Sequence, residues 1–189
     1  MVYTRKLIKN SLKFFGISLI LLSLAGCPNQ SGKNTYLVKR VSDGDTLNVA
    51  DAKGNTFTVR FACIDAPEIP HTQAEKQSGK LLDKNQFNGG IKAQHRVQQL
   101  IKQGGNRVSL TVTDTDQYKR KISEVRLPDG TLIQQVLVKE GLGMVYQSYL
   151  KNCPSADIVQ QAEAEAKKSS RGIWGDPKFV PPWQYRRIK

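Results

Sequence analysis

TFTVRFACI, residues 56–64, gives the clearest indication of the fold. Its phenylalanines and valine fall at every second position between polar residues, a period that predicts a long strand with one buried face. Two earlier segments, Tyr36–Val41 and Thr46–Val49, also have strand character and are bent around an Asp-Gly dipeptide. Asp51–Asn55 contains a glycine suited to a hairpin between the second strand and the third. The first part of the chain is therefore predicted to be a β-meander.

The chain after residue 64 is predicted to leave the sheet. Pro67 and Pro70 break the strand, and Ile69–Gly90 is polar and poor in β-branched residues, which predicts an irregular excursion. A helix is expected to begin at Gly90 and to end at Gly104, because its apolar residues recur with helical spacing. The residues expected on its buried face are Ala93, Val97, Leu100 and Ile101.

The last part of the chain is predicted to hold two more strands and two helices. The strands are Val108–Val112 and Ile122–Leu127, and the helices are Ile133–Glu140 and about Ser155–Ser170. The residues expected to face inward on the second helix are Ile158, Ala162 and Ala166. Five strands, with a helix between the third and the fourth, predict an α+β fold: a five-stranded OB-fold Greek-key β-barrel with about three α-helices. The Pro-containing tail, residues 176–189, is expected to wrap the surface or to be loose.

Length, composition and charge narrow the class of protein. The chain has 189 residues, 29 Lys and Arg against 16 Asp and Glu, and a formal charge of +13. This length suits a single domain. A content of 39% apolar and 24% charged residues excludes collagen-like, wholly disordered and multi-span membrane proteins. The large basic excess indicates an anionic partner, either nucleic acid or a negatively charged membrane surface.

Residues 1–26 have the pattern of an export signal. A basic start leads into an apolar stretch shorter than the about 20 residues of a membrane-spanning helix. The stretch ends in Leu24-Ala25-Gly26-Cys27, which resembles a bacterial lipoprotein signal with a lipidated cysteine; an ordinary signal peptide and a short membrane anchor are the alternatives. The predicted organisation is a signal peptide at 1–26, a flexible tether at 27–34, one folded domain at 35–175 and the tail. The protein is then expected to be exported and held to a membrane of the bacterial cell envelope by its lipid anchor alone.

Export would leave two further cysteines, Cys63 and Cys153, in a compartment where disulfides persist. A bond between them would close a long loop and contribute about 2–4 kcal/mol to stability. Two buried free thiols are the alternative. The sequence contains no CxxC motif and only two histidines, His71 and His95, which argues against a zinc site; both histidines are expected at the surface or on a helix face.

Three short segments contain the charged residues that point to a function. They are Asp43-Gly44-Asp45-Thr46, Arg60 with Asp65-Ala66-Pro67-Glu68, and Asp116–Arg120. Each alone is explained by turn formation or by local capping of the backbone. Together they supply a cluster of carboxylates and two arginines, an inventory that suits phosphodiester hydrolysis.

The reasons for this assignment are electrostatic. A hard cation held by carboxylate and carbonyl oxygens offsets the negative charge that accumulates on a phosphate during hydrolysis. Arginine binds phosphate through a fixed fork of donors and stays ionised. A carboxylate that does not bind the metal can orient or deprotonate the attacking water.

The motifs DGDT, R-x₄-D-A-P-E and D-x-Y-x-R, in this order and at roughly this spacing, resemble those of the staphylococcal nuclease (thermonuclease) family. The resemblance covers about Thr35–Trp174 and includes Gly141–Tyr146 and Arg171–Trp174. It implies a Ca²⁺-dependent nuclease that cleaves DNA and RNA with little sequence preference and leaves 3′-phosphate ends. It implies no protein partner, so a monomer is expected.

The same resemblance implies a role for each site residue. The expected metal ligands are Asp45, Asp65 and the backbone carbonyl of Ala66, with Asp43 just behind them. The expected water-positioning glutamate is Glu68, and the expected phosphate-binding arginines are Arg60 and Arg120. Tyr118 and Tyr146 are expected near the terminal phosphate and the base of the substrate, with plain aromatic packing as the alternative.

The sequence departs from the family pattern in three places. Lys119 stands where family members often have glycine, and a turn that needs positive φ there would present Arg120 differently. Gln117 lacks the positive charge that some members place at this position, and residues 72–90 are longer than expected and could shape access. The competing hypothesis is a non-catalytic OB-fold lipoprotein that holds nucleic acid at the cell surface. The carboxylates argue against it, because they repel a polyanion unless a cation occupies them.

Overall fold

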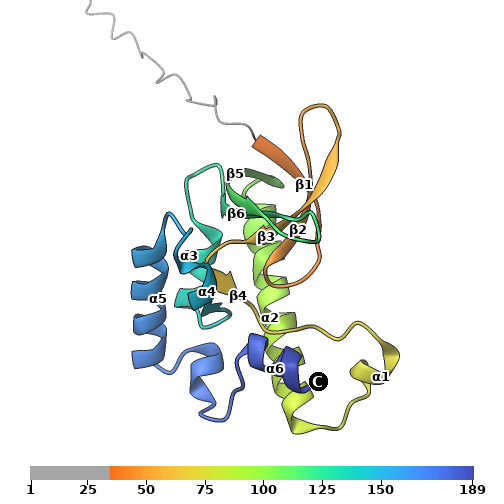
Figure 1. Ribbon diagram of the computed structural model, residues 1–189, viewed down its shortest axis with the longest axis vertical. Coiled ribbons are helices and arrows are strands. Elements are labelled where there is room, and N and C mark those ends of the chain that lie inside the picture. Colours follow the sequence, from red (N-terminus) through yellow and green to blue (C-terminus); the bar gives the residue numbers. More distant parts are fainter. Residues whose placement is uncertain (1–34) are drawn as a thin grey trace, which may run out of the picture. The chain divides into compact units, whose positions relative to one another are not determined.

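Five strands close into a barrel in the computed structural model, which describes residues 35–189. In chain order they are β1 (Thr35–Val41), β2 (Thr46–Ala50), β3 (Thr56–Phe61), β5 (Arg107–Thr115) and β6 (Lys121–Arg126). They are ordered β1-β2-β3-β6-β5 around the barrel (Figure 1). Strands β3 and β6 are parallel, and the other neighbouring strands of the barrel are antiparallel. The predicted five-stranded OB-fold barrel is confirmed. The predicted signal peptide, the tether and Cys27 lie outside the described residues.

The barrel encloses an apolar core that follows from the strand alternation. In β3, Val59 and Phe61 are fully buried, while Thr58 and Arg60 beside them are partly exposed. The barrel strands contribute to the core the buried side chains Leu47, Val49, Val59, Phe61, Val108, Ile122 and Val125. Burial of each such side chain stabilises the fold by roughly 1.5–3 kcal/mol.

The third strand ends at Phe61 rather than at the predicted residue 64. Cys63 has a left-handed backbone, with φ of 73°, and this turns the chain out of the barrel. The next two residues form β4 (Ile64–Asp65), which pairs with β7 (Met144–Val145) in a separate two-stranded sheet. A disulfide joins Cys63 to Cys153 beside this sheet. The segment that follows β3 is therefore fastened to the C-terminal half of the chain.

The long helix α2 (Leu81–Gln103) begins nine residues before the predicted start at Gly90, and a single-turn helix, α1 (Gln73–Lys76), precedes it. The irregular excursion expected over residues 69–90 is therefore wrong in its second half. The face predicted to be buried is confirmed, because Ala93, Val97, Leu100 and Ile101 are all buried. The additional N-terminal turns of α2 bury Gln86 and Phe87.

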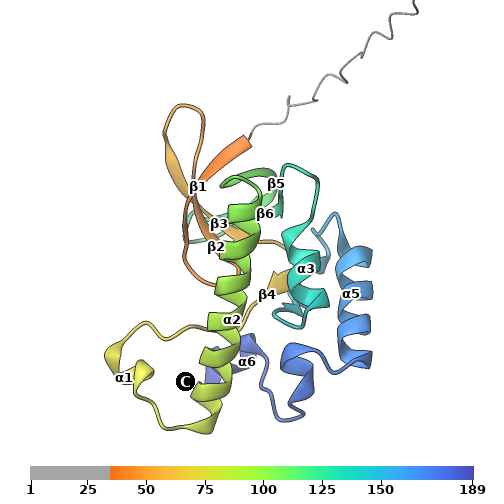
Figure 2. The ribbon, with the colours of Figure 1, turned by 180° about the vertical axis from the view of Figure 1, so that it is seen from behind.

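The C-terminal half contributes α3 (Ile133–Lys139), α4 (Gln147–Leu150), α5 (Ala156–Lys168), the 3₁₀ helix η1 (Gly172–Gly175) and α6 (Pro182–Ile188). Residues 35–189 thus hold six α-helices, of which α1 and α4 are single turns. Both views show α3 and α5 side by side (Figure 2). The inward face of α5 is Val159, Ala162 and Ala166; Ile158, expected to face inward, is 42% exposed. Val159, rather than Ile158, completes this face because it lies three residues before Ala162 and seven residues before Ala166.

The tail, expected either to wrap the surface or to be loose, packs against α2. Tyr185 of α6 is 1% exposed, and its hydroxyl donates to Asp83 Oδ1 at 2.8 Å. Its ring meets the ring of Phe87 edge-on, with the centroids 6.2 Å apart. Gln86 donates to the carbonyl of Val180. These contacts explain why the first turns of α2 are helical. Among residues 35–189, no helix combines the length and the apolar character needed to cross a membrane.

Candidate active site

The turn between β1 and β2 places two carboxylates at the end of the barrel strands. Asp43 Oδ1 accepts a hydrogen bond from the Asp45 amide at 2.9 Å, which fixes the bend. At Gly44, a β carbon would lie 2.7 Å from the β carbons of both Ala66 and Ala93. Only glycine therefore lets this turn press against the segment after β4 and against α2.

Strand pairing brings the second charged segment to the first. Thr46 of β2 is the register partner of Arg60 in β3, and the Phe61 amide donates to the Asp45 carbonyl at 2.8 Å. The Ala66 amide donates to Asp45 Oδ2 at 2.6 Å. Two segments that are far apart along the chain thus meet through the carboxylate of Asp45.

Arg60 lies between two buried carboxylates. Its guanidinium forms ion pairs with both Asp45 and Asp65, which are 1% and 0% exposed. Burial raises the pKa of the neighbouring Asp43 above its ordinary value, although the charge of Arg60 and a hydrogen bond from Thr46 act in the opposite direction. The charge of Arg60 thus acts on all three carboxyl groups of this corner of the barrel.

Helix α2 holds Glu68 beside the ion pairs that Arg60 forms with Asp45 and Asp65. Its amide lies 3.4 Å from Gln86 Oε1, and a β carbon at Gly90 would overlap the carbonyl group of Glu68. The side chain of Glu68 is partly exposed, unlike that of Asp65. This carboxylate thus lies at the open side of the cluster, where water can reach it.

The third charged segment is the turn between β5 and β6. Asp116 Oδ1 accepts hydrogen bonds from the amides of Tyr118 and Arg120, both at 2.9 Å, and Asp116 Oδ2 accepts one from Arg120 Nε at 2.7 Å. Burial alone would raise the pKa of Asp116, but the side-chain and backbone hydrogen bonds of Arg120 hold it below its ordinary value. Lys119 has a φ of 63°, so lysine adopts the conformation that glycine would supply. The turn thus forms in spite of this departure from the family pattern.

Register places this turn next to the strand that carries Arg60. Lys121, which follows Arg120, is the partner of Val59 in the parallel β3–β6 pair. Within residues 35–189, the side-chain interactions of Arg120 are with Asp116 and with the ring of Tyr118, at 5.3 Å from the centroid. The structure therefore brings the backbone of Arg120 towards the cluster, while its guanidinium pairs with Asp116 rather than with Asp45, Asp65 or Glu68.

A further arginine, from the tail, reaches the same carboxylates. Arg186 of α6 donates from Nη2 to Asp65 Oδ2 at 2.7 Å and from Nη1 to Glu68 Oε1 at 2.6 Å. Sequence reasoning missed this residue because it expected residues 176–189 only to wrap the surface or to be loose, and assigned them no part in the site. A usable signal was present: Pro181 and Pro182 open the segment, and proline at the first helical position favours a helix start.

The two tyrosines expected at the substrate have different surroundings. Tyr118 is 70% exposed. Tyr146 is half-buried and packs against the ring of Trp183, with the centroids 5.3 Å apart, and against Tyr149 at 4.8 Å. Its amide donates to the Cys63 carbonyl at 2.9 Å, close to β4. His71 and His95 are exposed, as expected.

The oxygen donors of this cluster fit a hard cation. Asp45 and Asp65 are buried carboxylates that both pair with Arg60, and the amide of Ala66, which follows Asp65, donates to Asp45. Carboxylate and carbonyl oxygens are the ligands that calcium prefers. Cys63, Glu124 and Cys153 also lie together, but the two cysteines are bonded to each other and are not available as ligands.

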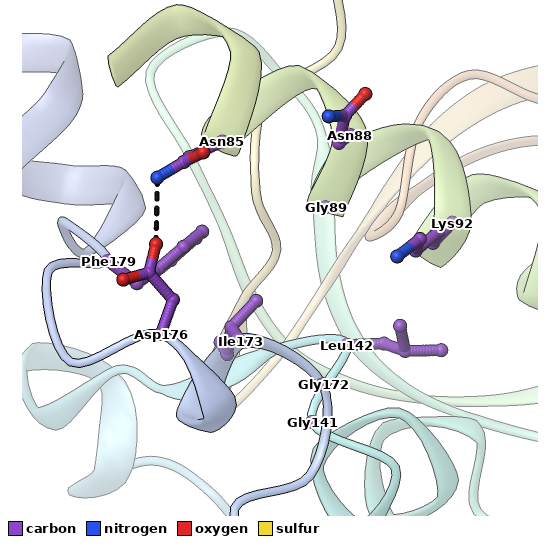
Figure 3. A pocket seen from close by; sticks show the side chains of 10 residues that line it. All are labelled: Asn85, Asn88, Gly89, Lys92, Gly141, Leu142, Gly172, Ile173, Asp176 and Phe179. Carbon is purple, nitrogen blue, oxygen red and sulfur yellow. Dashed lines mark hydrogen bonds between the residues drawn. The ribbon is translucent and has the colours of Figure 1, made fainter. Parts of the chain in front are cut away.

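A pocket of about 230 Å³ lies between α2, the turn after α3 that contains Gly141, and the start of η1 at Gly172. Asn85 of α2 donates to Asp176 Oδ2 at 2.7 Å at one end of it (Figure 3). None of Asp45, Asp65 and Glu68 lines this pocket. The pocket is thus separate from the carboxylate cluster.

Comparisons with known proteins agree with this geometry. The family model described as staphylococcal nuclease homologue matches residues 58–176. A protein of Escherichia coli O157:H7 described as an uncharacterized endonuclease is 32% identical over 152 residues, which cover 80% of this chain and 84% of that protein. A micrococcal nuclease of Shigella flexneri is 32% identical over 158 residues, 79% of each chain. An uncharacterized endonuclease of Haemophilus influenzae is 28% identical over 181 residues, 96% of this chain and 88% of that protein.

The match begins within β3 and includes Arg60, the carboxylates that follow the strand and the turn that carries Arg120. The nuclease relatives share the greater part of their length with the chain. The chain thus belongs to the staphylococcal nuclease family and is a phosphodiester hydrolase.

Proposed function

We propose that the protein is a calcium-dependent nuclease that hydrolyses DNA and RNA with little sequence specificity. The observation that carries the proposal is the position of Arg60 between the buried carboxylates Asp45 and Asp65, with Glu68 beside them. A protein that only bound nucleic acid would gain affinity by losing these carboxylates, because like charges repel. Their retention favours hydrolysis over simple binding.

The metal site of this proposal consists of Asp45, Asp65 and the carbonyl oxygen of Ala66, with Asp43 fixing the bend behind them. When bound, calcium supplies positive charge that offsets the charge developing on the phosphate. The burial of Asp45 and Asp65 strengthens such an interaction, because it excludes water from around the charges.

The remaining roles fall to side chains of the chain itself. Glu68 orients the attacking water and accepts its proton; its carboxylate is partly exposed, and its Oε1 must first release the hydrogen bond from Arg186. Arg60 and Arg120 bind the phosphate through their guanidinium forks. Attack of the water breaks the bond between phosphorus and the 5′ oxygen, so the 3′ end keeps the phosphate. Arg120 must exchange some of its contact with Asp116 for phosphate in this step.

Tyr118 and Tyr146 are the proposed contacts to the terminal phosphate and to the base. Tyr118 is exposed enough to meet a substrate directly. A ring can stack on any base, and phosphate contacts carry no sequence information. The same contacts therefore account for cleavage with little sequence preference.

The proposal extends to the location of the protein. Residues 1–26 act as a signal peptide, Cys27 carries a lipid and residues 27–34 tether a monomeric domain to a membrane of the bacterial cell envelope. The disulfide between Cys63 and Cys153 supports export, because such bonds persist in oxidising compartments.

Digestion of DNA by the purified protein, with Ca²⁺ and with a chelator, tests the proposal. We expect hydrolysis of single-stranded DNA and RNA with Ca²⁺ and none with the chelator. DNA that stays intact with several divalent ions while still being bound would contradict it and favour a non-catalytic binding protein.

Two variants test the assigned residues. Glu68→Gln and Arg120→Ala should each lower kcat by about 10²–10³ while the fold is retained. The matched controls are Glu165→Gln on α5 and Arg107→Ala at the start of β5, which remove an exposed carboxylate and an exposed guanidinium. Wild-type rates in Glu68→Gln and Arg120→Ala would show that these residues do not take part in hydrolysis.

A further inference from the structure

The C-terminal helix α6 reaches into the candidate metal site through one side chain. Arg186 donates to both oxygens of Asp65, from Nη2 to Oδ2 at 2.7 Å and from Nη1 to Oδ1 at 3.2 Å. The same Nη1 donates to Glu68 Oε1 at 2.6 Å. One guanidinium therefore bridges a proposed metal ligand and the proposed water-positioning residue.

In this arrangement the oxygens that a cation would need are already bonded to other groups. Asp65 Oδ1 pairs with Arg60 as well as with Arg186, and Oδ2 pairs with Arg186. Asp45 Oδ1 pairs with Arg60, and its Oδ2 accepts the Ala66 amide. Calcium requires six to eight oxygen ligands at close range. Arg186 therefore competes with calcium for Asp65, because both cations bind the same two carboxylate oxygens.

Contacts outside the site hold α6 in this position. Tyr185 bonds to Asp83 and packs on Phe87, and Lys189 forms an ion pair with Glu75 of α1. These contacts are made with α1 and α2 and do not involve Asp65. Arg186 is therefore delivered to the carboxylates by a docked helix and is not a free surface side chain.

The same helix also covers an aromatic residue assigned to substrate. The ring of Trp183, near the start of α6, lies against Tyr146 with the centroids 5.3 Å apart. In the proposed function Tyr146 meets a base of the nucleic acid. A docked α6 thus obstructs both the cation and the base at once.

We propose that α6 is an autoinhibitory latch, in which Arg186 competes with calcium for Asp65 and Glu68 while Trp183 covers Tyr146. Without calcium, Arg186 neutralises carboxylates that would otherwise repel one another, so the latch is closed. Calcium displaces Arg186, and α6 then leaves Tyr146 open to nucleic acid. The inference rests on the proposed function and adds to it a built-in competitor for the metal.

Calcium affinity is the first test. Isothermal titration calorimetry with Ca²⁺ alone compares the wild-type protein with Arg186→Ala and with Arg187→Ala, an exposed arginine on the same helix that takes part in none of the ion pairs of residues 35–189. The affinity of a site that is open only part of the time is reduced by the open fraction, so a latch closed nine-tenths of the time weakens binding about tenfold. We expect Arg186→Ala to lower the Kd for Ca²⁺ by about tenfold and Arg187→Ala to leave it unchanged.

Hydrogen exchange of α6 is the second test. In the wild-type protein, the amides of residues 183–189 should exchange faster after Ca²⁺ is added, and in Arg186→Ala they should exchange fast already in a chelator. The barrel amides of β2 and β3 should stay protected in both proteins and report an intact fold. Equal exchange of α6 with and without Ca²⁺ would overturn the inference.

The outcomes separate the latch from the proposed function. A Kd for Ca²⁺ that Arg186→Ala leaves unchanged or raises, or the absence of Ca²⁺ binding by either protein, would overturn the latch whether or not DNA is cut. Tighter Ca²⁺ binding by Arg186→Ala in a protein that hydrolyses no nucleic acid would support the latch and contradict the proposed nuclease activity.

Discussion

Gly90 of α2 lies so close to Glu68 that a β carbon at this position would overlap the carbonyl oxygen of Glu68. Glycine lowers helix stability by about 1 kcal/mol relative to alanine, so its presence inside a 23-residue helix needs a reason. The reason is the close approach of the backbone that carries the proposed water-positioning residue. Helix α2 is thus the surface against which the Pro67–Glu68 segment is set.

Replacement of Gly90 by alanine is expected to push this segment away from α2. The free energy of unfolding should fall by about 1–3 kcal/mol, the usual cost of overpacking, despite the better helix propensity of alanine. DNA hydrolysis should fall as well, because Glu68 moves. Urea denaturation and a digestion assay measure the two effects. Gly79→Ala is the matched control, since its β carbon would meet open space; equal losses in both variants would contradict the assignment.

Lys119→Gly is expected to stabilise the protein. The left-handed backbone of Lys119, with φ of 63°, costs a residue with a side chain about 1–2 kcal/mol, and glycine adopts it freely. Part of this gain is offset by the larger conformational freedom of glycine in the unfolded chain, so the net gain should be at most about 1 kcal/mol. Thermal unfolding provides the measurement. Gln117→Gly, in the same turn but without positive φ, should destabilise instead, and a loss of stability in Lys119→Gly would refute the argument.

Much of the fold could be predicted from the sequence because its signals are local. The alternation in β3 and the Asp-Gly turn before β2 each involve only a few neighbouring residues. The pairing of β2 with β3 then places Asp45 next to Arg60. The buried face of α2 after Gly90 follows in the same way from helical spacing.

The rest could not be predicted because it depends on contacts between distant parts of the chain. Asn85, Asn88 and two glycines make the first turns of α2 poor helix formers. Those turns are stabilised by Tyr185 and by the Val180 carbonyl from the tail. Arg186 meets Asp65 across a separation of 121 residues, which no local pattern reports.

Removal of the disulfide by Cys63→Ala together with Cys153→Ala should lower the free energy of unfolding by about 2–5 kcal/mol. The bond spans 90 residues and restricts the unfolded chain. Chemical denaturation of the double variant, with the wild-type protein in a reducing agent as the matched comparison, measures the effect. The two should show similar stability, and a double variant as stable as the oxidised wild-type protein would contradict a stabilising role.

Stability should fall in acid partly through Glu75. A hydrogen bond from the Lys189 ammonium, with further bonds from the Thr72 and His71 amides, lowers the pKa of Glu75 to about 2 from an ordinary value of 4.5. Because the folded-state pKa is the lower one, the contribution of Glu75 to stability is fully present above about pH 4.5 and is lost as the pH falls towards 2. The loss should loosen α6, since Lys189 is the last residue after that helix.

Glu75→Gln should therefore flatten the dependence of unfolding free energy on pH between about 4.5 and 2, since it leaves no carboxyl group to titrate there. Lys189→Ala should flatten it in part, because the backbone amides still bind Glu75. Denaturation curves across this range, together with hydrogen exchange of α6, make the comparison. If Glu75→Gln keeps the full wild-type slope, other carboxyl groups account for the acid sensitivity and the ion pair with Lys189 does not secure the helix.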